Sequence, residues 1–292
     1  MVGLIITAPE RMPLLHRAVR DALAIYYYPG MWDWDRSVRL PLVTRELERA
    51  VTRPQAAGGC AGPEAGQALR AGRALLDRYV VWAPSVDRFA PVLVAADFDV
   101  AVPDPAEPSS GLVTADGAAV HYGGRIDLLA ADQHDAYWIV RHRLTEDGWT
   151  PVGELAADQE ALAACWAWQQ FYLGMTITGT IWNELRVTHD EPPSPAAGRR
   201  WPWRRRPPPA PADSGPLVRQ HEPSGGGRSV PHHRRRQAQV SEPAHAAPVE
   251  QVTGDGFRRT WIRHRPAEIA AAGQRLAADL AAIVAPGRLG NR

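Results

Sequence analysis

The chain has 292 residues, a hydrophobic content of 45% and a formal net charge of +1. These values are ordinary for a globular protein, and a net charge so close to zero excludes a general electrostatic attraction to nucleic acid. The sequence contains no lysine, so all 33 basic side chains are arginine. We expect local arginine clusters, and not the overall charge, to decide any contact with a polyanion.

The cysteine count and the hydropathy exclude several further classes. Two cysteines, Cys60 and Cys165, cannot build a disulfide framework or supply the four thiolates of an iron–sulfur cluster. The apolar run at residues 4–6 is too short for a signal sequence, and no apolar stretch reaches the roughly eighteen residues of a membrane span. We therefore expect a cytoplasmic protein without an iron–sulfur cluster and without a membrane partner.

The first third of the chain has the pattern of helices. Apolar residues recur at spacings of three and four between residues 13 and 28, which predicts a helix with one buried face. Similar patterns predict helices at 42–51 and 64–82, separated by a stretch rich in glycine and proline at 54–63.

The middle of the chain changes to strand patterns. Runs rich in β-branched and aromatic residues predict strands at 91–100, 119–130 and 136–144. A helix at 155–173 and a strand at 176–187 follow. The aromatic residues of this helix have helical spacing and are expected in the core: Trp166, Trp168, Phe171 and Tyr172.

A change in composition divides the chain into three parts. Residues 188–254 are dominated by Pro, Arg, Ser, Gly and His and predict a disordered linker, whose arginine runs at 204–206 and 234–236 would suit phosphate contacts. A strand at 257–263 and a helix at 266–283 follow. We expect an α/β domain at 1–187, the linker at 188–254, and a C-terminal strand and helix at 255–292 that pack back on the domain.

Two motifs in the strand region carry a family resemblance. The first is Tyr-Gly-Gly-Arg-Ile-Asp at 122–127, and the second is Trp-Ile-Val-Arg-His-Arg at 138–143. Together they resemble the core of the PD-(D/E)XK nucleases, in the RecB-like branch, over about residues 13–186 and more weakly over 256–284. The resemblance implies a mixed α/β fold, in which helices flank a central mixed sheet, with a long disordered insertion.

The same resemblance implies a metal site whose charges are partly reversed. In that family a histidine on the first helix, an aspartate and the acidic residue of Asp/Glu-x-Lys hold a divalent ion such as Mg²⁺ or Mn²⁺. His16 and Asp127 match the first two positions, whereas Arg141 stands in place of the acidic ligand and Arg143 in place of the lysine. A carboxylate about 4 Å from a divalent ion contributes on the order of 8 kcal/mol at an effective dielectric near 20, and a guanidinium there reverses the sign.

Two further family features are not matched. The further acidic residue expected just before the aromatic of the first strand is not matched, because Ala95 and Ala96 precede Asp97 and Phe98 there. A Gln-x-x-x-Tyr signature is also missing, because Ala163 follows Gln159 at that spacing. Several acidic residues have the composition of turns and are not expected as ligands: Asp132, Asp135, Glu146 and Asp147.

The strand pattern predicts how the motif residues are arranged. Arg141 and Arg143 should share one face of their strand, with His142 on the other. If the two strands pair, Arg141 should form an ion pair with Asp127 in the space of the metal. The simpler alternatives are that His16 is a hydrogen-bonded helix residue, that Asp127 is an ordinary strand charge, and that both arginines are solvated.

These observations predict an inactive, nuclease-like protein, a pseudoenzyme that binds DNA or a protein partner. One alternative is an active DNA nuclease that uses Mg²⁺ or Mn²⁺ with relocated ligands. Another is a non-nuclease interaction protein that uses the arginine- and proline-rich segment for its contacts.

Overall fold

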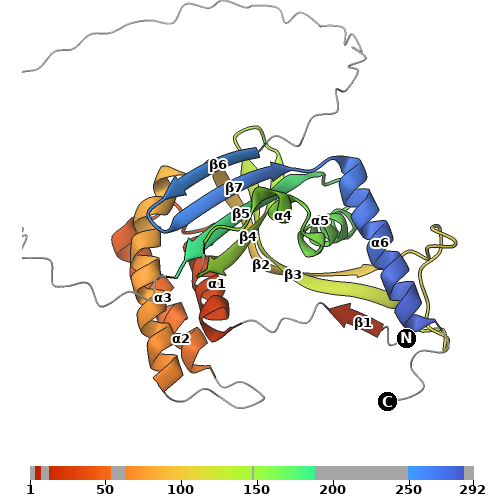
Figure 1. Cartoon of the computed structure of the whole chain (residues 1–292), viewed down its shortest axis with the longest axis horizontal. Helices are drawn as coiled ribbons and strands as arrows, with labels where there is room; N and C mark the ends of the chain where they lie inside the picture. Colours follow the sequence, from red (N-terminus) through yellow and green to blue (C-terminus); the bar gives the residue numbers. More distant parts are fainter. Residues whose placement is uncertain (1–3, 8–12, 54–62, 147, 188–248, 286–292) are drawn as a thin grey trace, which may run out of the picture. The chain divides into compact units, whose positions relative to one another are not determined.

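A mixed sheet of seven strands runs through the part of the chain that the computed structural model describes, which comprises residues 4–7, 13–53, 63–146, 148–187 and 249–285 (Figure 1). The strand order is β1-β3-β4-β5-β7-β6, and β2 also pairs with β3. The expectation of a mixed α/β fold with a central mixed sheet is thereby confirmed. The strands are β1 (Leu4–Thr7), β2 (Phe89–Ala101), β3 (Val120–Asp132), β4 (Tyr137–Thr145), β5 (Ile177–Arg186), β6 (Val249–Gly254) and β7 (Phe257–Arg263).

Strand β3 is the most heavily paired strand of the sheet. Antiparallel β2 follows one of its edges from residue 121 to residue 132. The other edge is shared by parallel β1, at residues 120–123, and by antiparallel β4, at residues 128–131. Among the described residues, no strand pairs with this edge at 124–127, so the end of the first sequence motif lies in a gap of the ladder.

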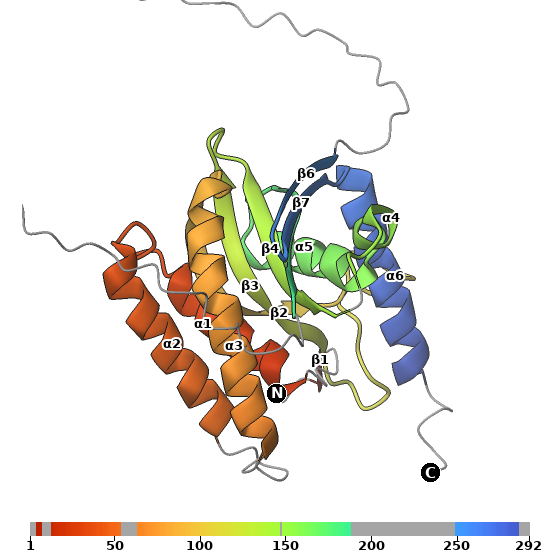
Figure 2. The same cartoon turned by 60° about the vertical axis from the view of Figure 1, so that its left-hand side comes forward.

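Three helices cover one face of the sheet: α1 (Leu14–Tyr26), α2 (Arg36–Thr52) and α3 (Pro63–Trp82) (Figure 2). The three expected helices are confirmed. Helix α2 begins earlier than expected because Asp35 caps it, accepting a hydrogen bond from the Ser37 backbone N–H at 2.7 Å, and because the helix accommodates Pro41.

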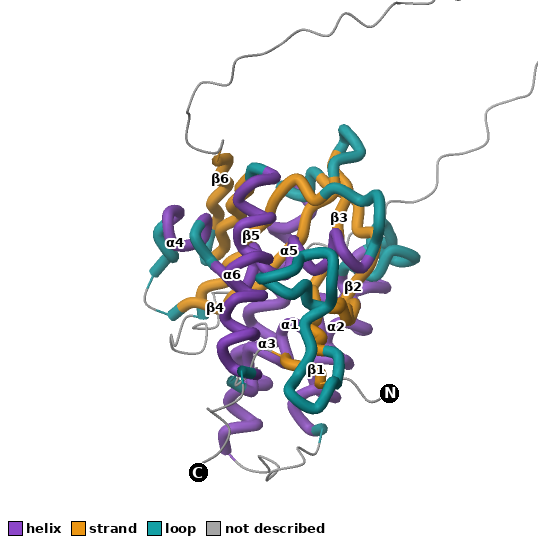
Figure 3. The backbone as a smooth tube through the Cα atoms, turned by 90° about the vertical axis from the view of Figure 1, so that its right-hand side faces the viewer, coloured by secondary structure: helices purple, strands orange, loops and turns teal. Residues whose placement is uncertain are grey.

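The opposite face is covered by α5 (Gln159–Phe171) and α6 (Pro266–Val284), which pack on each other (Figure 3). The helix expected at 155–173 is in fact two helices, because the short helix α4 (Val152–Ala156) ends with Ala157 as its C-cap and Asp158 then caps α5. Trp166 and Trp168 are buried as expected, whereas Phe171 and Tyr172 are 43% and 40% exposed, so their assignment to the core was wrong.

The C-terminal elements join the same sheet. Strand β7 pairs with β5, and α6 follows it, as expected from the sequence. The predicted linker boundary at residue 254 was wrong, because β6 forms an antiparallel hairpin with β7. The remainder of that prediction, residues 188–248, lies outside the described residues.

The ladder between β6 and β7 closes from Gly254 to Phe257, leaving Asp255 and Gly256 as the turn. Gly256 has φ 78°, a conformation that glycine adopts without strain. An Asp-Gly pair is a strong hairpin signal that the low-complexity composition of the neighbouring segment obscured.

No helix in the described part of the chain combines the length and the hydropathy that a membrane span requires.

Candidate functional site

The two sequence motifs meet at a fork in the sheet. The ladder between β3 and β4 ends at the pair Leu128 and Val140, and β4 then continues beside β5 alone. Asp127 and Arg141 would be the next pair in this ladder, so they stand on either side of the fork. Helix α1 crosses the face at this point and supplies His16 and Arg20.

Both carboxylate oxygens of Asp127 are occupied. The His142 backbone N–H donates to Oδ2 at 2.7 Å, and Nε of Arg20 donates to Oδ1 at 2.6 Å. The second guanidinium arm of Arg20 also contacts Oδ1. Burial alone would raise the pKa of Asp127, but Arg20, followed by His142 and Arg141, holds the pKa below its ordinary value. Asp127 is therefore an ionised carboxylate whose counter-charge is a guanidinium.

His16 completes the hydrogen bonding at the fork. Its Nε2 lies 3.1 Å from the carbonyl oxygen of His142. Because a carbonyl only accepts, Nε2 must carry the proton and cannot serve as a metal ligand in this arrangement. Burial lowers the pKa of His16, which favours this neutral form.

His16 and Asp127 thus share one structural task. In a continued ladder, the N–H and the C=O of His142 would bond to β3. After the fork these two groups bond to the Asp127 side chain and the His16 side chain instead. A buried strand edge requires such partners, so both residues have a structural reason to be present.

Arg141 is placed differently from the expectation. The predicted ion pair between Arg141 and Asp127 is replaced by the pair of Arg20 with Asp127, while the Arg141 guanidinium donates to Glu160 of α5 at 2.5 Å. Burial lowers the pKa of Arg141, but Asp127 and Glu160 outweigh it and leave the pKa above its ordinary value. The physical reason is that Arg141 points to the α5 face, whereas α1 presents Arg20 on the other side of the fork.

Arg143 lies one step further along β4 and away from Asp127. Its guanidinium lies 5.5 Å from the ring centre of Trp182 and 3.4 Å from Oγ1 of Thr150. His142 points to the opposite face, where its ring stacks on Tyr27 of α1. The predicted alternation of these side chains is confirmed, and the structure brings three of the four expected residues together at the fork.

The strand opposite Asp127 is irregular. Register pairs flank Ala95 on both sides, joining Val94 to Leu128 and Ala96 to Ile126, so Ala95 faces Asp127 across the ladder. Ala95 has φ 47°, in the left-handed region that costs an alanine roughly 1 kcal/mol or more. The local distortion therefore coincides with the position of the surviving acidic residue.

A buried polar network extends from the fork into the α1–α3 layer. His142 contacts Asn183 through Nδ1 at 3.0 Å, and Asn183 donates to the Tyr79 hydroxyl at 2.8 Å. The fully buried Arg259 donates to the hydroxyl groups of Tyr27 and Tyr79. Its charge is balanced by an ion pair with Asp87. Buried charges require such pairing, which explains why Arg259 is tolerated in the core.

Sequence reasoning missed Arg20, although a signal was present. Arg20 follows His16 by four residues, and this spacing places both side chains on one face of a helix. The buried pairs of Arg259 with Asp87 and of Arg258 with Glu184 were also missed, because each joins residues far apart in the sequence.

Asp132 makes the local backbone hydrogen bonds that its turn-like composition predicts. Asp132 accepts hydrogen bonds from the backbone of His134 and Ala136 and from the indole of Trp138. Asp147 lies outside the described residues. Within the described ranges, no group of three or more His, Cys, Asp or Glu side chains is arranged to hold a metal ion.

The residues at the fork do not fit a divalent metal. A guanidinium contacts the Asp127 carboxylate, the protonated nitrogen of His16 faces a carbonyl, and Arg141 is a further cation nearby. No step through a metal follows from this arrangement.

In comparisons with known proteins, no protein-family model and no curated protein matches the chain.

Proposed function

We propose that this protein is a non-hydrolytic member of the PD-(D/E)XK-like group, in the RecB-like branch, and acts by binding a nucleic acid or a protein partner. The observation that carries the proposal is the ion pair of Arg20 with Asp127. It gives the surviving acidic residue a permanent counter-charge from the protein itself.

The energy of this pair argues against occupation by a metal. A divalent ion beside Asp127 would have to displace Arg20 and would then lie near Arg141 as well. Each like-charged contact at about 4 Å opposes a divalent ion by on the order of 8 kcal/mol at an effective dielectric near 20. The alternative of a nuclease with relocated ligands would need carboxylates that outweigh both arginines.

The distribution of charge bears on the partner. Ten of the 33 basic residues and five of the 32 acidic residues lie between 188 and 248, which leaves 23 basic and 27 acidic residues in the rest of the chain. A polyanion would therefore be attracted to the segment 188–248 more than to the remainder. This observation favours a second candidate function, in which the arginine- and proline-rich segment makes the contacts of an interaction protein.

A cleavage assay tests the main proposal. Purified full-length protein is incubated with single-stranded and double-stranded DNA and with RNA, in Mg²⁺ or Mn²⁺, beside an Asp127→Asn variant. We expect no cleavage above a buffer control from either protein. Metal-dependent cleavage that the variant loses would overturn the proposal in favour of an active nuclease.

A deletion separates the two binding candidates. The deletion should span residues 190–245, because a longer one would remove β6 from the sheet. If the main proposal is right, the shortened protein keeps its partner binding. A complete loss of binding, with the unfolding transition unchanged, would support the second candidate.

A further inference from the structure

A groove of about 490 Å³ lies beside helix α6, on the side where α6 meets α4 and α5 (Figure 1). Its walls come from the first half of α6, from the residues that join β7 to α6, and from the facing ends of α4 and α5. The volume falls in the range of small-molecule sites, roughly 300–1,000 Å³. No residue that lines this groove belongs to the fork.

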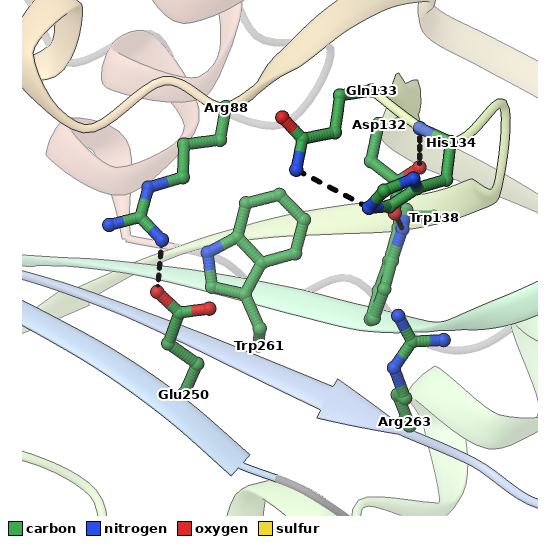
Figure 4. A pocket seen from close by; sticks show the side chains of 8 residues that line it. All are labelled: Arg88, Asp132, Gln133, His134, Trp138, Glu250, Trp261 and Arg263. Atoms are coloured by element: carbon green, nitrogen blue, oxygen red, sulfur yellow. Dashed lines mark hydrogen bonds and ion pairs between the residues drawn. The ribbon is translucent and has the colours of Figure 1, made fainter.

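Another hollow, of about 250 Å³, lies at the end of the β3–β4 hairpin (Figure 4). Its two indole rings, of Trp138 and Trp261, are 2% and 9% exposed, and Arg263 lies over the Trp138 ring at 5.2 Å. A ligand would therefore find no free aromatic face there. The groove beside α6 differs from this hollow, because several of its hydrogen-bond donors have no acceptor.

His264 is a buried polar side chain at the groove. The residue is only 8% exposed, and its Nε2 lies 3.0 Å from the hydroxyl oxygen of Thr180. Burial lowers the pKa of His264, although Glu268 opposes the shift, so the ring is neutral at neutral pH. The other ring nitrogen, Nδ1, forms no hydrogen bond with any described residue. When the Thr180 hydroxyl donates to Nε2, Nδ1 carries the proton and lacks an acceptor.

The start of α6 supplies a second donor. Pro266 has no N–H, and it is the first residue of the helix. The N–H groups of Glu268 and Ile269 both bond to the carbonyl oxygen of Arg265. Among the described residues, the N–H of Ala267 has no backbone partner of this kind. Ala267 lines the groove, where the positive end of the helix dipole favours an anion.

Arg275 places a positive charge at the other end of the groove. Its Nε donates to Gln159 of α5 at 2.9 Å, and it forms no ion pair with any described carboxylate. Because a helix rises about 1.5 Å per residue, Ala267 and Arg275 lie roughly 12 Å apart along α6, and the arginine side chain leans back towards the helix start. The groove therefore offers two separate places to an anionic group.

Between these two places the accessible wall is apolar. Ala156, Ala267 and Ala271 line the groove and are exposed or half-buried, whereas Leu162 and Ile262 reach it from the core. Methyl groups offer no hydrogen bonds, so this wall suits an aliphatic chain better than a polar one.

We propose that the groove binds a small aliphatic dicarboxylate. One carboxylate would accept from Nδ1 of His264 and from the N–H of Ala267, and the other would pair with Arg275. The chain between them would lie along the alanine wall. Bonds of this kind are strong because the acceptor is charged. The inference goes beyond the proposed function, since it concerns a small ligand and uses no residue of the fork.

Glu268 opposes this binding. Its carboxylate lines the same groove and accepts from the backbone N–H of Arg265 at 2.8 Å, as part of the cap of α6. A carboxylate bound at the helix start would be repelled by it. Glu268→Gln should therefore tighten the binding, because the amide oxygen still caps the helix and the charge is gone.

Isothermal titration of the full-length protein with suberate, an unbranched dicarboxylate, tests the proposal. Octanoate has a chain of the same length with one carboxylate, and succinate has both carboxylates on a chain too short to reach from His264 to Arg275. Each should bind at least about tenfold more weakly than suberate. Equal affinity for suberate and octanoate would overturn the proposal.

Two variants locate the ligand, each with a matched control. Arg275→Gln should weaken suberate binding about tenfold, whereas Arg263→Gln, which removes an exposed arginine at the other hollow, should leave it unchanged. Ala271→Leu fills the groove and should abolish binding, whereas Ala270→Leu adds the same side chain at the exposed position beside it and should not. Equal affinities in a variant and its control would contradict the assigned place.

The imidazole of His264 gives a direct readout of the first carboxylate. Its ring nitrogen resonances, assigned by their loss in His264→Gln, should shift when suberate saturates the natural protein. Binding that leaves these resonances unchanged would place the ligand elsewhere. Absence of suberate binding at millimolar concentration would also overturn the proposal, whatever the cleavage assay shows.

Discussion

The backbone N–H of His142 on β4 donates to the side-chain carboxylate of Asp127 on β3 at 2.7 Å, at the place where the two strands separate. This bond replaces the ladder bond that the diverging strand has lost. Because Arg20 neutralises the same carboxylate, Asp127 is both a strand-edge partner and half of a buried ion pair. The residue most suggestive of catalysis therefore has a structural role that needs no metal.

The first prediction concerns the stability of this pair. Asp127→Ala should lower the free energy of unfolding by about 3–5 kcal/mol, because the Arg20 guanidinium and the His142 N–H would lose their acceptor in a buried place. Asp127→Asn should cost less, since the amide oxygen still accepts. Urea unfolding measures both, and a loss below about 1 kcal/mol for Asp127→Ala would contradict the structural role.

The second prediction concerns acid sensitivity. Burial lowers the pKa of His142 from 6.5 to about 4, although Asp127 opposes the shift. The unfolded chain therefore takes up this proton first, so the free energy of unfolding should fall as the pH drops from about 6.5 towards 4. The contribution is on the order of 3 kcal/mol, and it is fully retained above pH 6.5.

His142→Gln supplies the control for this measurement, because it removes the titration and keeps a hydrogen-bonding side chain. Urea unfolding across the pH range should show a flatter profile for the variant than for the natural protein. The lowered pKa of His16 acts in the same direction and remains in both proteins. Parallel profiles would show that His142 does not titrate as described.

The third prediction concerns the distorted strand. Ala95 has φ 47° opposite Asp127, so Ala95→Gly should relieve a left-handed strain and raise the free energy of unfolding by about 0.5–1 kcal/mol. Ala96→Gly is the matched control. A glycine at this neighbouring position in the strand should lower the free energy of unfolding instead of raising it. Thermal unfolding distinguishes the two, and destabilisation by both variants would contradict the strained conformation.

The fourth prediction concerns the C-terminal strand. A Cβ atom on Gly179 would lie 2.0 Å from the Ile262 carbonyl oxygen, so Gly179→Ala should force β5 and β7 apart. We expect a loss of about 1–3 kcal/mol in the free energy of unfolding. Gly153→Ala in helix α4, where a Cβ meets nothing within 4 Å, should leave it unchanged or raise it by up to about 1 kcal/mol, because alanine favours the helix. Equal effects would show that β7 does not pack here.

Much of the fold could be predicted from periodicity, because the amphipathic helices and the buried strands follow simple spacing rules. Strand β7 and helix α1 illustrate this, since both elements were predicted from the local sequence, although the burial of Arg258 and Arg259 within β7 was not. Strand β6 was missed because its composition blends into the preceding segment. Strand β1 was missed because four residues carry too little pattern.

The site was harder to predict for a different reason. The alternation along β4 placed Arg141 and His142 on opposite faces, as local geometry requires. The identity of the cation beside Asp127 depended on how α1 crosses the sheet, which no strand pattern contains. Arg20 was therefore missed, while its charge and effect were assigned to Arg141.

Manganese binding, followed by the electron paramagnetic resonance signal of free Mn²⁺, tests the central claim most directly. The natural protein and an Arg141→Asp, Arg143→Lys variant should both leave the signal unchanged, because Arg20 still pairs with Asp127. Adding Arg20→Ser to that variant should produce binding, since the carboxylate loses its counter-charge and gains an acidic neighbour. Binding of Mn²⁺ by the natural protein that Asp127→Asn abolishes would contradict the account.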